Sequence, residues 1–109
     1  MARLTQPIGV IGQSLDIDTD DAISGQITVT TAGTAVNGPD VALTNGAWIK
    51  ALAGNTGVVY VGSDGAGDVT DANGFQLNKG EVVLVQVANL SDLWFDAATS
   101  GDKLCWLKA

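Results

Sequence analysis

The chain has 109 residues, of which 46% are hydrophobic and 16% charged, and twelve acidic residues against five basic ones give a formal net charge of −7. A protein with this charge repels the phosphate backbone of nucleic acid, so we expect no nucleic-acid partner. Its apolar runs fall far short of the roughly 20 residues that a membrane-spanning helix needs, so no membrane partner is expected either.

The length suits one domain with a single core of modest size. The N-terminus lacks the apolar stretch of a secretory signal peptide, and the lone Cys105 cannot form an internal disulfide. We therefore expect synthesis in a reducing cytoplasm. Because the hydrophobic fraction is high for so short a chain, some apolar surface should remain outside the core, and this favours self-association.

The first 25 residues differ in composition from the rest and predict an extended N-terminal arm over residues 1–25, which docks on neighbouring subunits. Apolar side chains alternate with acidic ones at residues 15–18, as in a short edge strand. An extended peptide of this kind can add a strand to a neighbouring sheet while its apolar side chains fill pockets. The apolar anchors of the arm are Ile8, Val10, Ile11, Leu15, Ile17 and Ile23.

Short β-branched runs, separated by turns rich in Gly, Asn and Asp, fill residues 26–109. Seven or eight such runs, with almost no helical periodicity, predict an all-β domain, a single small β-sandwich over residues 26–109. The expected strands cover residues 26–31 with a continuation at 34–36, then 47–52, 58–62, 75–77, 81–87, 92–96 and 103–108.

Alternation along these strands assigns side chains to faces. In the last strand, Leu104 and Trp106 share one face, and Cys105 and Leu107 share the other. Further predicted groupings are Ile49 with Ala51, Phe75 with Leu77 pointing inward, and Leu93 with Phe95 opposite an outer face of Asp92, Trp94 and Asp96.

The sequence holds no convergent catalytic set. Histidine is absent, so Cys105 has no histidine as its base. Asp92 and Asp96 would lie about 13 Å apart along an extended strand, farther than the roughly 5 to 9.5 Å that glycosidases use. The glycine-rich residues 64–68 lack the Lys and Ser or Thr of a phosphate-binding loop. We expect no enzyme, no catalytic residue and no cofactor.

The acidic run that begins at Asp16 is similar to the start of a calcium-binding EF-hand loop, but it cannot complete one. Position 6 of such a loop is Asp21 instead of Gly, and position 12 is Ile27 instead of Glu. No metal site is expected, and a weak calcium site shared with Asp64 or Asp68 is left open.

Three tryptophans could pack in a core or interface, or form a platform for a sugar. Trp94 is the one expected to meet a partner or solvent, because it shares a strand face with Asp92 and Asp96. A sugar site would require Trp94 and Asp96 to be exposed together in a groove.

Several segments resemble small virion proteins of tailed bacteriophages, which are assigned to the capsid exterior as head decoration or cement proteins. The resemblance is carried by Gly-Asn-Thr-Gly-Val-Val-Tyr-Val-Gly at residues 54–62, by Asn-Gly-Phe-Gln-Leu at 73–77, by Lys-Gly-Glu at 79–81 and by residues 96–107. It extends to residues 29–36, so it covers roughly residues 26–108 and leaves the arm unmatched.

The resemblance implies a β-sandwich, the jelly roll being one candidate topology, that forms a homotrimer on the outside of a virion capsid. Its partner would be the major capsid protein, whose subunits it would bridge. The expected contact residues are Ile8, Val10, Ile11, Leu15 and Ile17 of the arm together with Trp94. The alternative is a receptor- or glycan-binding module of a phage fibre.

Overall fold

The computed structural model describes residues 22–65 and 67–109. Over these residues the protein is all-β, as predicted, and its only helix is the single 3-10 turn η1 (Leu90–Asp92). No helix in the described part of the chain is long and apolar enough to cross a membrane. The strands are β1 (Ser24–Thr28), β2 (Val36–Asn37), β3 (Ala47–Ala51), β4 (Val59–Gly62), β5 (Phe75–Leu77), β6 (Val82–Val85), β7 (Trp94–Ala97) and β8 (Lys103–Lys108).

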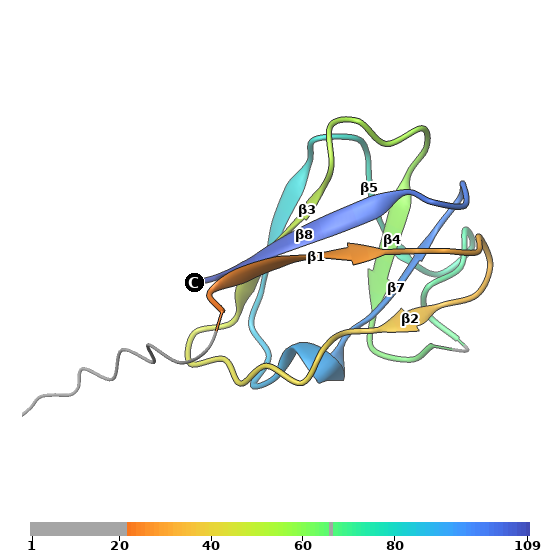
Figure 1. Cartoon of the computed structure of the whole chain (residues 1–109). Coiled ribbons are helices and arrows are strands. Elements are labelled where there is room, and N and C mark those ends of the chain that lie inside the picture. The colour runs from red at the N-terminus through yellow and green to blue at the C-terminus, as the bar shows by residue number, and fades with distance from the viewer. Residues whose placement is uncertain (1–21, 66) are drawn as a thin grey trace, which may run out of the picture.

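The strands form two four-stranded antiparallel sheets, with the orders β1-β8-β3-β6 and β2-β7-β4-β5. Each of the first four strands pairs with one of the last four in reverse order along the chain: β1 with β8, β2 with β7, β3 with β6 and β4 with β5. This is one long antiparallel ribbon wound into two layers, joined by the β3–β8 and β4–β7 pairings. The topology is therefore that of an eight-stranded jelly roll. Figure 1 shows the two layers, with the C-terminus beside the start of β1.

The core lies between the two sheets. Phe95 of β7 is fully buried and belongs to one cluster with Ile49 and Leu104 of the other sheet. Burying a side chain of this size contributes about 1.5–3 kcal/mol. The predicted faces of β3 and β8 are confirmed, since Ile49, Ala51, Leu104 and Trp106 are buried, whereas Leu107 is exposed and Cys105 is half-buried.

Two buried polar side chains hold the turns at one end of the sandwich. Asp102 accepts hydrogen bonds from the backbone N–H groups of Thr56 (2.9 Å) and Gly57 (2.8 Å), one on each carboxylate oxygen. The amide of Asn55 pairs with both backbone groups of Lys103, at 2.8 and 2.9 Å. These bonds give partners to backbone groups that would otherwise be buried without one.

Two predicted strands are shorter than expected. The strand predicted at residues 26–31 begins at Ser24, inside the segment assigned to the arm, and ends at Thr28. The strand predicted at 81–87 covers only Val82–Val85. Both differences follow the strand registers, because β8 pairs with Ser24–Thr28 and β3 pairs with Val82–Val85.

One prediction about burial is wrong, and one side chain on a correctly predicted face is buried. Phe75 shares the inner face with the buried Leu77, but it is 50% exposed because it lies at the end of the edge strand β5, beyond the core. Asp96 lies on the outer face as predicted, but it is only 6% exposed, because a loop covers that face. The arm anchors Ile8, Val10, Ile11, Leu15 and Ile17 lie outside the described residues.

Candidate functional site

The outer face of the β1-β8-β3-β6 sheet is the most distinctive surface of the described protein. Its side chains form two rows across all four strands, because the strand registers place them opposite one another. One row is Ser24, Leu107, Trp48 and Leu84, and the other is Gln26, Cys105, Lys50 and Val82. We call this surface the outer apolar face.

Large hydrophobic side chains on this face remain in contact with water. The exposed fraction is 41% for Trp48, 47% for Leu107, 39% for Leu84 and 53% for Val82. Ile23, immediately before β1, is 61% exposed. Together they leave roughly 400 Å² of apolar surface, which is within the range of the largest, and often functional, patch on a monomer.

A shallow depression of about 480 Å³ lies in this face. Its lining is almost wholly apolar and comes from Trp48, Val82, Cys105, Leu107, Trp106, Ser24 and the side chain of Lys50. A depression with so few polar groups suits an apolar side chain of a partner better than a polar metabolite.

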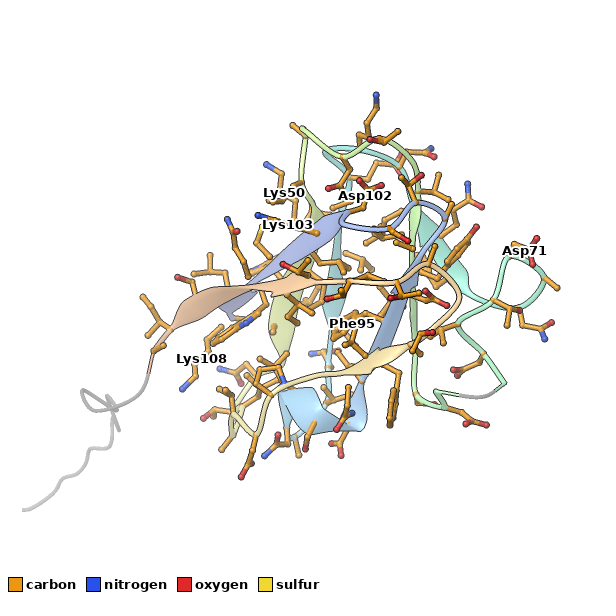
Figure 2. The ribbon with its side chains drawn as sticks, turned by 45° about the vertical axis from the view of Figure 1, so that its right-hand side comes forward. Lys50, Asp71, Phe95, Asp102, Lys103 and Lys108 are labelled. Atoms are coloured by element: carbon orange, nitrogen blue, oxygen red, sulfur yellow. The ribbon has the colours of Figure 1, made fainter. Side chains whose placement is uncertain are left out.

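The charge on this sheet is opposite in sign to that of the whole chain. Its four strands contain Lys50, Lys103 and Lys108, and they contain no Asp or Glu. Lys50 and Lys103 are exposed. Figure 2 shows the three lysines on the β1, β3 and β8 side of the molecule and Asp71 on the far side. In a chain of net charge −7, this sheet is therefore a local cationic and apolar surface.

The outer face of the second sheet is covered by the chain itself. The described residues of loop 63–74, which are 63–65 and 67–74, pack across it, and Val69, 1% exposed, lines the same hollow as Tyr60, which is 7% exposed. The backbone of Gly74 lies so close to Tyr60 that a Cβ at Gly74 would approach the tyrosine Cβ to 2.8 Å. The two outer faces thus differ in kind, since only one of them has a cover within the described chain.

Asp68 fixes the start of this loop. Its carboxylate accepts hydrogen bonds from the backbone N–H groups of Ser63 (2.9 Å) and Asp64 (2.7 Å) and from the Ser63 hydroxyl (3.2 Å). The Ser63 backbone bond, followed by that of Asp64, lowers the pKa of Asp68 below its ordinary value of 3.8, because the bonds stabilise the charged form.

The Trp94 and Asp96 side chains are not exposed together. The ring of Trp94 is half-buried against Gly65, where a Cβ would approach the ring to 2.6 Å. One oxygen of the Asp96 carboxylate accepts hydrogen bonds from the backbone N–H groups of Gly33 (3.0 Å) and Ala97 (2.7 Å). The arrangement that motivated a sugar site is therefore not present, and the exposed tryptophan is Trp48.

Asp96 does lie at the floor of a second, more polar hollow of about 490 Å³. The turn at Ala32 and Gly33 forms one wall, and loop residues Val69 to Asp71 form another. The hollow holds only two carboxylates, Asp71 and Asp96, and no three His, Cys, Asp or Glu side chains gather for a metal ion anywhere in residues 22–65 and 67–109. The calcium site left open by the sequence would also need Asp16 and its neighbours, which lie outside the described residues.

Comparison with models of protein families, with curated proteins and with solved structures finds no match.

The sequence prediction named Trp94 as a contact residue and missed the outer apolar face. The missed residues are Trp48, Val82, Leu84 and Leu107, which the strand registers bring together. A signal was present in Val82-Val83-Leu84-Val85, which is apolar on both faces, a pattern typical of a strand that is covered on both sides. In the structure only Val83 and Val85 pack on the core.

Proposed function

We propose that this chain is a structural protein of a tailed-bacteriophage particle: a decoration protein that binds the outside of the head and stabilises it by bridging subunits of the major capsid protein. The observation that carries the proposal is the outer apolar face, a cationic and apolar sheet surface that nothing in the described chain covers. Such a surface suits contact with protein. The phage context comes from the resemblance of residues 26–108.

The apolar area that the outer apolar face can bury predicts that each contact is weak and that many contacts act together. Covering roughly 400 Å² of apolar surface contributes on the order of 10 kcal/mol at about 25 cal/mol per Å². Association costs about 4–15 kcal/mol in lost freedom, so one such contact has little surplus. A capsid lattice presents many equivalent sites, and linked contacts there raise the overall affinity without any new interaction.

Adding the purified full chain to expanded, undecorated shells tests the proposal. We expect saturable uptake and a higher disruption temperature of the shell. Trp48→Ala should reduce uptake, because it removes the centre of the outer apolar face. Lys79→Ala is the matched control, since Lys79 is exposed in a turn outside this sheet. An absence of saturable uptake, or equal uptake by all three proteins, would refute the proposal.

A further inference from the structure

We infer that the outer apolar face binds a second copy of this chain in a head-to-tail contact, against the acidic surface formed by loop 63–74 and Phe75. The inference rests on the proposed function only in treating the outer apolar face as the contact surface. The proposed function assigns this face to contact with capsid subunits, and the inference adds a second copy of the chain as a further partner of the same face.

The first argument is the distribution of exposed apolar side chains. Six large hydrophobic residues of the described chain are exposed, and five of them lie on or directly beside the β1-β8-β3-β6 sheet. The sixth is Phe75, on the edge strand β5 of the other sheet. The chain therefore carries two separate apolar surfaces, one broad and one with a single projecting ring. A projecting ring and a shallow depression about 480 Å³ in volume are complementary in shape.

The second argument is charge. The broad surface carries Lys50 and Lys103 and has no carboxylate on its four strands. Phe75 directly follows loop 63–74, which carries Asp64, Asp68 and Asp71. The turn at the end of this loop is closed by a 2.7 Å hydrogen bond from the Gly74 N–H to the Thr70 carbonyl. Asp71 is exposed and lies on the far side of the molecule from the three lysines (Figure 2).

The charges of these two surfaces favour head-to-tail over symmetric self-association. A symmetric face-to-face dimer would bring Lys50 and Lys103 of both copies into one interface, where like charges oppose association. A head-to-tail contact instead pairs the lysines of one copy with the carboxylates of the next. Contacts of this type use two different surfaces of each copy, and they close into rings where the rotation between copies allows it.

The contact should depend on salt and on concentration. The exposed apolar patch of roughly 400 Å² is about half of what each partner contributes to a standard interface, so the flanking lysines and loop must supply the rest. Exposed charge pairs contribute little to affinity but set the orientation, and salt screens them. The assembled fraction of the full chain should therefore rise with protein concentration and fall as salt is added.

Light scattering and sedimentation of the full chain, without shells, test the inference. The face variant Lys50→Glu/Lys103→Glu should raise the dissociation constant by about tenfold for two lost charge pairs, and the loop variant Asp71→Lys should raise it by about threefold for one. Lys79→Glu makes the same kind of charge change outside both surfaces and should leave the constant unchanged. Phe75→Ala should weaken assembly without any change of charge, and circular dichroism checks that every variant is folded.

Mixing the two charge variants distinguishes head-to-tail from symmetric contact. The face variant keeps the acidic loop, and the loop variant keeps the lysines of the outer apolar face. In a head-to-tail contact these two intact surfaces bind each other, so the mixture should assemble at concentrations where each variant alone does not. A symmetric contact predicts wild-type assembly of the loop variant and no rescue on mixing, and this result would overturn the inference.

A full chain that is monomeric at all concentrations would also overturn the inference. If that monomer were still taken up by shells in a Trp48-dependent way, the proposed function would stand. Assembly without shell uptake would refute only the proposed function.

Discussion

Trp48 of β3 lies directly opposite Leu107 of β8, and both side chains point away from the core. The neighbouring residue on β3, Ile49, pairs with Trp106, and both of these are buried. Neighbouring residue pairs of the same sheet thus point to opposite faces: Ile49 and Trp106 pack in the core, and Trp48 and Leu107 face water. This separation allows the stability of the fold and the contact function to be tested independently.

Ile49→Ala and Trp48→Ala should differ sharply in their effect on stability. Ile49 is fully buried, so its truncation leaves a cavity and should lower the free energy of unfolding by about 2–5 kcal/mol. Trp48 is 41% exposed, and its truncation should cost about 1 kcal/mol in the monomer. Urea denaturation at low protein concentration measures both values. Equal losses would mean that Trp48 is part of the core.

Asp102→Ala should loosen the turn that contains Thr56 and Gly57. The substitution leaves the two backbone N–H groups without their carboxylate acceptors, which should cost about 1–3 kcal/mol. Hydrogen exchange should accelerate at the Thr56 and Gly57 amides before it does in β3 or β8. Asp92→Ala removes an exposed carboxylate and is the control. Unchanged exchange at both amides would show that Asp102 does not hold this turn.

The start of loop 63–74 should open in acid. Hydrogen bonds from Ser63 and Asp64 keep the pKa of Asp68 below 3.8 in the folded protein. The stabilisation is therefore complete above the pKa of the unfolded chain and is lost as the pH falls through the lower, folded value. Proton exchange at the Ser63 and Asp64 amides should show this loss relative to other loop amides. Asp68→Asn, which cannot ionise, should abolish the pH dependence, and its persistence would assign the effect to another group.

Gly46→Ala should be more damaging than Gly33→Ala. Both glycines have positive φ angles, 83° and 86°, so alanine pays a similar backbone cost of about 1 kcal/mol at either position. A Cβ at Gly46 would also collide with the carbonyl oxygen of Val85, whereas a Cβ at Gly33 meets nothing within 4 Å. Thermal denaturation of the two variants isolates the steric effect. Equal melting temperatures would contradict this account of the turn that precedes β3.

Much of the fold could be predicted from the sequence because each strand combines alternation with a turn signal at its ends. This pattern alone groups Ile49 with Ala51, and Leu104 with Trp106, on one face of their strands, and all four side chains are buried. Phe75 was misplaced because alternation identifies which residues share a face but does not show where the facing sheet ends. Asp96 lies on the predicted face but is buried because a loop covers that face, and no local pattern reports the path of a loop.

The outer apolar face could be predicted only in part from the sequence. The high hydrophobic fraction indicated surplus apolar surface, but its location depends on strand register, which aligns Leu107, Trp48 and Leu84 from three separate segments. The segregation of lysines from carboxylates likewise emerges only when β3 and β8 become neighbours. Pairing between distant segments is a property of the folded sheet, so single-strand patterns do not contain it.

Electron cryo-microscopy of the phage particle that we propose contains this chain tests the central claim most directly. The account predicts copies of the jelly roll on the outside of the head, with protein density covering Trp48 and Leu107 on every copy. A particle without the chain, or copies whose outer apolar face is open to solvent, would contradict it.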